Sequence, residues 1–169
     1  MNDWEEKNKL YLADVTALKD PLIQHSVNYM EHAVSYAQIC VKWAFLLNGG
    51  ALVALPALGS FVSSTDARST AIYYVVGLIL IALCSFLAYI NFMAMAQYKE
   101  NEATRLHWQT LGVYFGNEHN QEKTSESIQL CNKSMDKNLT VMKVTFWFAI
   151  VVGLSSYVSF LIGSLSLLN

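Results

Sequence analysis

Hydrophobic residues are concentrated in three long runs, which cover residues 43–62, 71–96 and 144–168. Each run is 20 to 26 residues long and contains no Asp, Glu, Lys, Arg or His. About 20 apolar residues are enough for a helix to cross the roughly 30 Å hydrocarbon core of a bilayer. Three such runs are too many to hide inside a soluble globule of 169 residues. The pattern therefore predicts three transmembrane helices.

The polar segment 1–42 precedes the first run and is predicted to form two cytoplasmic helices. Asp3 begins a capping box, which indicates a short amphipathic helix over about 4–18. Asp20 and Pro21 give a second helix start. From there a coiled-coil-like seam of apolar residues, at alternating steps of four and three, continues into the first run. The seam consists of Ile23, Val27, Met30, Val34, Ala37 and Val41.

Two more polar segments, 63–70 and 97–143, separate the runs. The first is predicted to be a tight external hairpin loop. In the second, we expect one helix to stop at Gly116-Asn117 and the next to be capped by Asn120, which makes a cytoplasmic helical hairpin. The expected fold is all-α. It is a three-span membrane helical bundle whose helices extend into a cytoplasmic coiled-coil-like bundle, with a short N-terminal amphipathic helix added.

The charged residues are distributed unevenly around the spans. Ten of the eleven Lys and Arg residues lie in 1–42 or 97–143, and only Arg68 lies between the first two runs. Because basic residues mark the cytoplasmic side, we expect a bacterial inner-membrane protein with a cytoplasmic N-terminus and an external C-terminus. The net charge of −2 gives no indication of nucleic acid binding. Spans without charges argue against a proton-coupled transporter or a voltage sensor.

Two amide side chains interrupt the apolar runs. Asn48 lies six residues beyond Lys42, and Asn91 lies eight residues before Lys99. These offsets correspond to depths of about 9 and 12 Å on neighbouring antiparallel helices. The favoured interpretation is that the two amides hydrogen-bond to each other and hold the helix pair together. The alternative is that they line a pore or bind a ligand.

Small residues and a proline shape the first run. Gly49 and Gly50 lack side-chain bulk, and Gly50, Ala54 and Ala57 follow one another at helical spacing, so another backbone can approach closely. Pro56 removes one backbone hydrogen bond and is expected to kink the helix. Such a kink either shapes packing, which is the commoner case, or acts as a gating hinge.

In the third run, Ser155, Ser159 and Gly163 recur at four-residue steps, and Gly153 and Ser156 belong to a neighbouring face. Faces of small residues typically pack helix against helix, within one chain or between copies. One face can serve packing within the chain, and a second suggests contact with another copy. Serines that line a polar channel are the alternative.

Candidates for sensing lie in the cytoplasmic segments and comprise His25, Glu31, His32 and His107. Histidine titrates near neutral pH, so pH sensing is one interpretation. Metal-binding residues on a helix prefer spacings of three or four, and no HxxxH, HExxH or paired Cys motif occurs, so neither a metal nor a cofactor is expected. Phosphate-binding and nucleophile motifs are lacking, and we expect no enzyme. The groups that an enzyme would have to assemble are Glu31, His32, Glu100, Glu102 and His107.

The segment KWAFLLNGGALVALPALG, residues 42–59, resembles a sequence found in small uncharacterised bacterial multi-pass membrane proteins. In those proteins a leucine-rich run meets Asn-Gly-Gly-Ala at the start of a span, and some are encoded as membrane effectors of anti-phage systems. This chain has Pro56 where such runs usually continue with Leu or Ala. The resemblance implies an inner-membrane protein that acts by assembling, and it assigns no role to any residue.

Two functions are compatible with these patterns. The first is a homo-oligomer that perturbs the bilayer or acts as a channel-like effector of the anti-phage type. The second is a membrane anchor or adaptor whose cytoplasmic helices recruit a soluble partner protein. In both, the lipid bilayer surrounds the spans, and the two functions differ in the purpose of the cytoplasmic helices.

Overall fold

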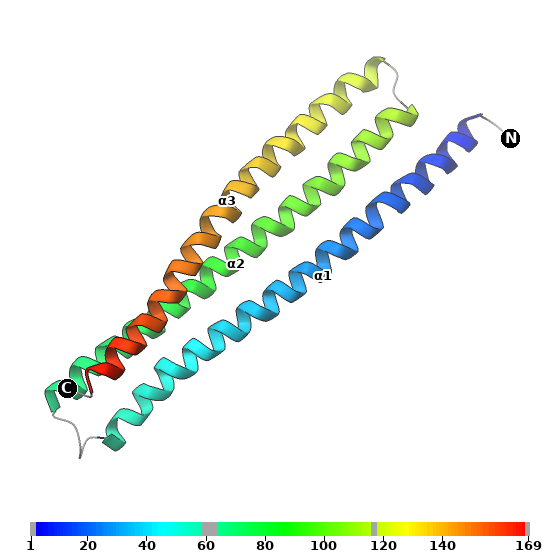
Figure 1. The fold of residues 1–169 in the computed structure, drawn as a ribbon. Coiled ribbons are helices and arrows are strands. Elements are labelled where there is room, and N and C mark those ends of the chain that lie inside the picture. The colour runs from blue at the N-terminus through cyan, green and yellow to red at the C-terminus, as the bar shows by residue number, and fades with distance from the viewer. Residues whose placement is uncertain (1–2, 59–63, 116–117, 168–169) are drawn as a thin grey trace. The chain divides into compact units, whose positions relative to one another are not determined.

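The computed structural model describes residues 3–58, 64–115 and 118–167, and the chain is helical almost throughout these ranges (Figure 1). Three long α-helices follow one another, with a short 3-10 helix after the first. The elements are α1 (Asp3–Ala54), η1 (Leu55–Leu58), α2 (Ser64–Phe115) and α3 (Glu118–Leu165).

Each long helix contains a stretch that is long and apolar enough to cross a membrane. The three stretches lie within Met30–Ala57, Asp66–Gly112 and Gln121–Leu165. The prediction of an all-α fold with three candidate membrane spans is therefore confirmed. Because a helix rises about 1.5 Å per residue, each long helix exceeds the length that a bilayer core requires.

The chain divides into two compact units, and each contains segments of all three long helices. The apolar unit comprises residues 33–91 and 143–169, and the polar unit comprises residues 1–32 and 92–142. The apolar unit contains most of the three hydrophobic runs, and the polar unit contains most of the charged residues.

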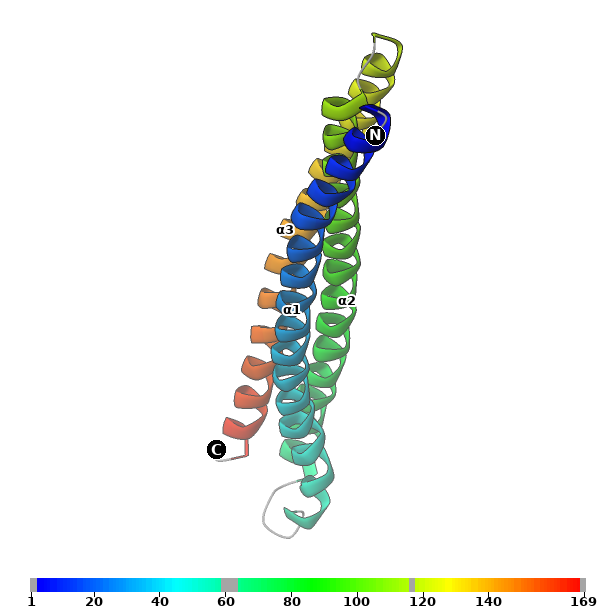
Figure 2. The ribbon, with the colours of Figure 1, turned by 90° about the vertical axis from the view of Figure 1, so that its right-hand side faces the viewer.

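The first helix, α1, runs without a break from Asp3 to Ala54, as Figures 1 and 2 both show. The prediction of a separate helix over 4–18 is wrong, because Pro21 lies inside α1 instead of starting a new helix. A proline in a helix interior costs one backbone hydrogen bond and crowds the carbonyl of the residue four before it. Pro21 and Ala17 are both exposed, so this carbonyl can still bond to water.

The α-helical part of α1 ends at Ala54, two residues before Pro56, and the chain continues as η1. Pro56 therefore does not kink a continuing α-helix, as the sequence suggested, but follows its end. The physical reason is that proline lacks the N–H that the next α-helical turn needs and restricts the residue before it. The predicted first span extends to 62, and its last residues, 59–62, lie outside the described ranges.

The connections between helices are shorter than expected. The predicted external loop over 63–70 is helical from Ser64 onward, and Asp66 in the first turn of α2 complements the helix dipole. The predicted stop at Gly116-Asn117 lies outside the described residues, but α2 does end at Phe115. The third helix begins at Glu118, two residues before the predicted cap.

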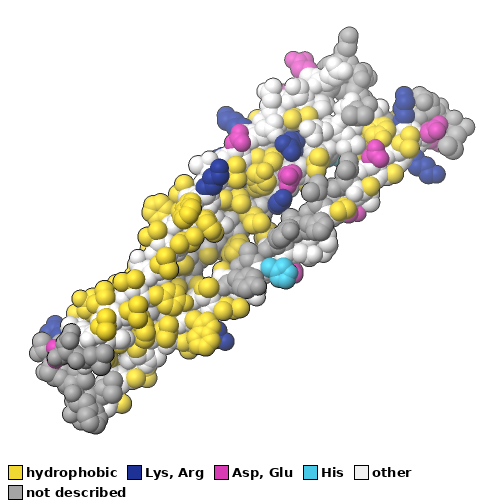
Figure 3. Space-filling view, viewed as in Figure 1, with side chains coloured by type: hydrophobic (Ala, Val, Ile, Leu, Met, Phe, Trp, Pro, Cys, Tyr) yellow, Lys and Arg dark blue, Asp and Glu magenta, His cyan; other side chains and the backbone are white. Residues whose placement is uncertain are grey.

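The surface of the apolar unit is hydrophobic. Within residues 43–57, 71–91 and 144–165, every described residue that is exposed is aliphatic, aromatic, proline or glycine. Figure 3 shows hydrophobic side chains in yellow covering much of one face, with the charged side chains gathered elsewhere. A water-soluble protein rarely exposes a large contiguous apolar surface of this kind, whereas lipid tails solvate it well.

The interior of the same unit is polar or small at many positions. The buried polar residues of the apolar unit are Asn48, Thr70, Thr145, Ser156 and Ser159. Polar groups inside and apolar groups outside are the arrangement expected of helices in a bilayer, where side-chain hydrogen bonds and close packing hold helices together. The distribution supports the assignment of these helices as membrane spans.

The predicted coiled-coil seam remains a prediction. Two of its residues on α1, Ile23 and Val27, are exposed in the polar unit. The other residues of the seam are half-buried and comprise Met30, Val34, Ala37 and Val41.

Candidate functional site

Asn48 is the centre of a polar contact between the three spans of the apolar unit. Its side chain is 0% exposed, and so is that of Ser156 on α3. The amide Nδ2 of Asn48 donates hydrogen bonds to Ser156 Oγ at 3.2 Å and to the carbonyl of Ala44, one turn earlier, at 3.0 Å. Ser156 Oγ in turn donates to the carbonyl of Gly77 on α2 at 2.9 Å. Two side chains therefore connect α1, α2 and α3 at one level.

Gly77 makes this contact possible because it has no side chain. A Cβ atom at Gly77 would lie only 2.0 Å from Asn48 Oδ1 and 2.5 Å from Asn48 Cγ. Real Cβ atoms essentially never approach another atom so closely, so only glycine fits while Asn48 keeps this position. The helices α1 and α2 approach each other closely at this point.

Asn48 Oδ1 is buried and has no hydrogen-bond partner among the described residues. The orientation of the amide follows from its surroundings, because Nδ2 faces two oxygen acceptors and only a donor nitrogen suits both. Most buried polar atoms in proteins are bonded, so an unpaired carbonyl oxygen is unusual. It lies against the backbone of Gly77, where a Cα–H group is a weak donor.

Further side-chain hydrogen bonds join α2 to α3 or to Ser166 just beyond it, and one of them is donated by Cys84 Sγ to the Ala149 carbonyl at 3.3 Å. At one end of the apolar unit, Asn91 Nδ2 donates to Thr145 Oγ1 at 2.8 Å. At the other end, Thr70 and Ser166 share a bond of 2.7 Å between their hydroxyl groups. Between them, the bonds are Ser159 Oγ to the Tyr73 carbonyl at 2.6 Å and Tyr74 Oη with Ser164 Oγ at 3.2 Å. Each such bond in a membrane contributes about 0.6 kcal/mol, up to about 1.7.

The predicted hydrogen bond between Asn48 and Asn91 is wrong, because both amides bond to α3 instead. The residue of α2 that lies opposite Asn48 is Gly77, and Asn91 is fourteen residues further along, or about 21 Å. The prediction measured depth from Lys42 and Lys99 as if both marked the same membrane boundary. The contact between Asn48 and Gly77 within the apolar unit shows that Asn48 and Asn91 do not lie at the same level.

The small residues of α1 face in two directions. Gly49 packs near Leu78 of α2, whose Cδ2 atom would lie 3.8 Å from an added Cβ. Gly50 is exposed, and an added Cβ there would meet nothing within 4 Å. Ala54 and Ala57 are exposed as well. The stripe of Gly50, Ala54 and Ala57 therefore lies on the outer surface of the apolar unit.

The small residues of α3 also separate into two groups. Ser159 and Gly163 are buried, and an added Cβ at Gly163 would lie 2.9 Å from the ring of Tyr74. Ser155 instead donates to the carbonyl of Val151 in its own helix at 2.8 Å. Of the three predicted residues, two pack against α2 and one satisfies its hydroxyl locally.

In the polar unit, Tyr11 connects α1 to α2. It is buried, its hydroxyl shares a hydrogen bond of 2.9 Å with His107 Nδ1, and its ring meets the rings of His107 and Tyr114 edge to face. Tyr114 donates a short hydrogen bond to the Asp14 carboxylate. Burial raises the pKa of Tyr11 above its usual 10.0, and the bond to Asp14 raises the pKa of Tyr114.

Other contacts of the polar unit join α2 to α3. Asn101 Nδ2 donates to Ser134 Oγ at 3.0 Å, and Arg105 donates to Asn132 Oδ1 at 3.4 Å. Asn138 is buried, and its Nδ2 group has no partner among the described residues. These contacts lie on residues that the sequence patterns did not single out.

The predicted sensing residues with described side chains are Glu31, His32 and His107. Glu31 and His32 are exposed on α1, and the side chain of His25 lies outside the described set. His107 bonds to Tyr11, and Glu102 pairs with Lys99 at 2.8 Å. In the part of the chain that the structure describes, no group of three or more His, Cys, Asp and Glu side chains could hold a metal ion.

Sequence reasoning missed Gly77 and Thr145 and gave Ser156 only a secondary place. Ser156 lies three residues before Ser159 and seven before Gly163, so a helical projection of α3 groups all three on one face. Gly77, by contrast, is one glycine within a long apolar run, and nothing in the sequence pairs it with Asn48.

No family model matches the chain, and no curated protein or solved structure matches it. The interpretation of the contacts above therefore depends on their geometry and chemistry.

Proposed function

We propose that the protein is a membrane anchor whose polar unit lies in the cytoplasm and recruits a soluble partner protein. The observation that carries this proposal is the use of the polar side chains in the spans. Asn48, Asn91 and Ser159, which were candidates for a pore lining, bond to neighbouring helices of the same chain, whereas the candidate Ser155 bonds within its own helix. The first three act as contacts that close the interior of the apolar unit, which suits an anchor better than a channel through one chain.

The polar unit supplies surface for docking. Several large apolar side chains are exposed on it among charged residues, and Trp4 (61% exposed) and Leu130 (63%) are the most exposed of them. Isolated apolar residues on a surface are ordinary, but aromatic and aliphatic side chains are also the usual anchors of protein interfaces. A soluble partner with an apolar groove fits this surface chemically.

The orientation of the protein is part of the proposal and follows from its basic residues. Ten of eleven Lys and Arg residues flank the spans on one side, so that side is cytoplasmic under the positive-inside rule. Reporter fusions test this directly. A cytoplasmic reporter inserted within 117–120 is expected to be active, and the same reporter fused after Asn169 is expected to be inactive. Activity at Asn169 would refute the orientation.

An ion-flux assay tests the proposal against the channel interpretation. The full chain is reconstituted in liposomes loaded with an ion-sensitive dye, and the flux is compared with that of liposomes without protein. An anchor gives no flux above this background. Reproducible flux that scales with the protein-to-lipid ratio would count decisively against the anchor.

One observation favours a second candidate, a homo-oligomeric membrane effector. Gly50, Ala54 and Ala57 form a stripe of small residues that faces outward from α1, where another helix of the bilayer can pack closely. Substitution of Gly50 by Leu separates the two candidates. Gly50→Leu blocks close helix packing between copies, whereas an added Cβ at this position meets nothing within 4 Å in the chain. Only an oligomer therefore loses its assembly, and crosslinking in membranes measures that loss.

A further inference from the structure

The outer side of α1 contains a short polar stripe at the level of the spans. Ser35, Gln38 and Lys42 follow one another at steps of three and four residues, so they share one helix face, and all three are exposed. Ala44, which is 0% exposed, lies two residues beyond Lys42 and so about 200° around the helix axis. The stripe therefore points away from α2 and α3, toward the surroundings of the protein.

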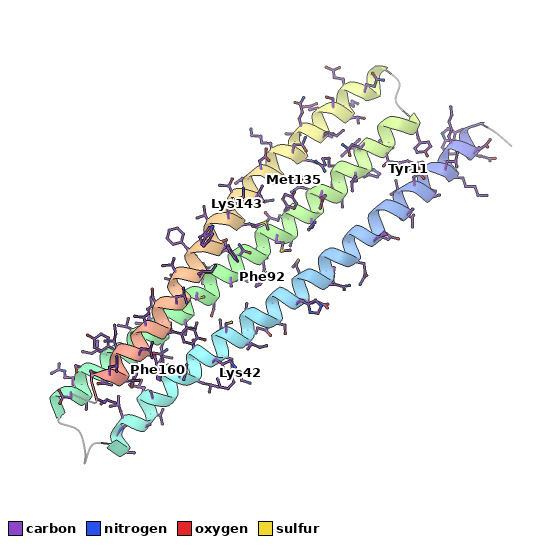
Figure 4. All side chains as sticks on the ribbon, in the orientation of Figure 1. Tyr11, Lys42, Phe92, Met135, Lys143 and Phe160 are labelled. Carbon is purple, nitrogen blue, oxygen red and sulfur yellow. The ribbon has the colours of Figure 1, made fainter. Side chains whose placement is uncertain are left out.

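The register of the helices gives the depth of Lys42. Asn48 bonds to Ser156, and α1 and α3 run in the same direction, so Lys42 lies level with Ile150, six residues before each partner. Lys143, which marks the start of the apolar run of α3, is seven residues earlier, or about 10 Å. Figure 4 shows Lys42 between the levels of Phe160 and Lys143. Lys42, which directly precedes the first apolar run, therefore lies level with residues inside the apolar run of α3.

A charged side chain at this depth needs a partner. Charged side chains in a bilayer are costly, and those found there mostly face other protein groups, water or the interface. In a helix the Cα–Cβ bonds tilt toward the N-terminus, so the Lys42 side chain leans toward Gln38 and the Lys143 side of the bilayer. The flexible lysine stem can lie along apolar surface while its ammonium group approaches the headgroups.

We propose that Lys42, Gln38 and Ser35 form a binding site for the phosphate of an anionic phospholipid in the leaflet on the Lys143 side. The three side chains offer an ammonium, an amide N–H and a hydroxyl, which are all hydrogen-bond donors, and a phosphate offers acceptor oxygens. The site holds the headgroup of one lipid close to α1, deeper in the bilayer than the headgroups of the surrounding lipids. This inference rests on the proposal that the apolar unit spans a membrane.

A second copy of the chain is a poorer occupant of this face. Two copies that met symmetrically through the stripe would place Lys42 against Lys42, and like charges repel. The runs 43–62, 71–96 and 144–168 contain no Asp or Glu that could neutralise it. The nearest acidic residue on α1, Glu31, is eleven residues away, or about 16 Å along the helix. Charge complementarity thus favours the lipid phosphate.

The experiment measures which lipid stays bound to the full chain. The protein is placed in nanodiscs of equal parts phosphatidylcholine and phosphatidylglycerol and extracted into mild detergent, and the retained lipids are counted by native mass spectrometry. The wild-type protein is expected to retain phosphatidylglycerol in preference. Lys42→Gln is expected to lower the ratio of phosphatidylglycerol to phosphatidylcholine about fivefold, the effect of one basic residue near a charged surface. Lys42→Arg keeps the charge and is expected to keep the ratio.

Lys143→Gln is the matched control, because it removes the same charge at the edge of the apolar run. It is expected to change the ratio by less than about twofold, since an interfacial lysine acts on many exchanging lipids rather than on one held headgroup. An unchanged ratio in Lys42→Gln, or an equal fall in both variants, would overturn the proposal. Displacement of the retained lipid by excess inorganic phosphate would also overturn it, because it would indicate a site for free anions.

Failure of this proposal can be distinguished from failure of the anchor. If the protein did not span a membrane, alkaline extraction would release it from native membranes, whatever the residue at 42. If it spans the membrane without a lipid site, it resists extraction, and the lipid ratio is insensitive to Lys42.

Discussion

The apolar and polar units are built from the same three helices, yet they differ most in the residues that they expose. In the apolar unit the outer surface is hydrophobic, and Asn48, Thr145 and Ser156 are buried. In the polar unit charged residues lie outside, and the buried residues include apolar or aromatic ones, such as Tyr11 and Met135, and polar ones, such as Thr124 and Asn138. Water drives apolar side chains inward, whereas lipid offers no such force, so hydrogen bonds and close backbone approach must hold the spans together. A single helix can therefore change its packing chemistry along its length.

The largest expected loss of stability follows from substitution of Gly77, because the packing of the apolar unit requires a residue without a side chain there. Gly77→Ala places a Cβ 2.0 Å from Asn48 Oδ1, and we expect a loss of about 2–3 kcal/mol in the free energy of unfolding. Gly50→Ala is the matched control, because an added Cβ there meets nothing within 4 Å. Unfolding in mixed micelles, followed by circular dichroism, measures both.

The variant Asn48→Ala distinguishes a steric clash with the Asn48 side chain from a general effect of alanine at position 77. Asn48→Ala loses the bond to Ser156 but also removes the atoms that obstruct a Cβ at Gly77. The double variant Asn48→Ala, Gly77→Ala should therefore lose less stability than the sum of the losses in the two single variants. Equal stability of Gly77→Ala and Gly50→Ala would show that the close approach at Gly77 is not required.

The polar unit should respond to loss of one hydroxyl group at Tyr11. Tyr11→Phe keeps the ring contacts with His107 and Tyr114 but removes the hydrogen bond of 2.9 Å, so about 1 kcal/mol of stability should be lost. Hydrogen exchange followed by mass spectrometry localises the effect. Faster exchange is expected in residues 3–32 and not in the spans. Uniformly faster exchange in both units would mean that the units unfold together.

The serines of α3 give a smaller effect that tests the role of bonds between helices. Ser159→Ala removes a bond to the Tyr73 carbonyl, and we expect a loss of about 0.6 kcal/mol. Ser155→Ala removes only a bond within α3 and should change stability by less. The same unfolding measurement applies, and a larger effect at Ser155 would argue that the outer face of α3 is itself an interface.

The smallest expected effect is an alkaline weakening confined to the polar unit. The pKa values of Tyr11 and Tyr114 are raised above 10.0 in the folded protein, so folding favours their neutral forms. Their contribution is complete below pH 10.0 and is lost as the pH rises through the folded-state pKa values. Helical content measured between neutral and strongly alkaline pH should fall less in the double variant Tyr11→Phe, Tyr114→Phe. An identical fall in that variant would assign the weakening to other groups.

The sequence predicted the spans well because the absence of charges over 20 or more residues is a strong signal. The stop signal at Gly116-Asn117 and the cap at Asn120 placed the end of α2 and the start of α3 to within a few residues, whereas the start of α2 was placed about seven residues too late. The rule that Asp20 and Pro21 start a new helix failed, since a helix can accept one proline when the carbonyl it frees is exposed.

The hydrogen-bond partners of Asn48 could not be predicted from the sequence, and the reason is physical. Depth was counted from the nearest lysine on each helix, and that count assumes that all lysines lie at one membrane boundary. Lys42 lies level with Ile150 and well beyond Lys143, so the count misplaced α1 against α2. Helix register is set by packing between particular residues, such as Gly77 and Asn48, and a single sequence contains no record of such pairs.

The side-chain bonds described between helices of the apolar unit all end on α3 or on Ser166 just after it, and this has a consequence for how the protein is made. A ribosome delivers α1 and α2 to the membrane before Ser156, Thr145 and Ser159 exist. During that interval the Asn48 and Asn91 amides lack these partners and sit in lipid. A chain cut short before α3 would carry this exposed polarity permanently. For a chain that spans a membrane, the arrival of the last helix is the step that pairs these amides.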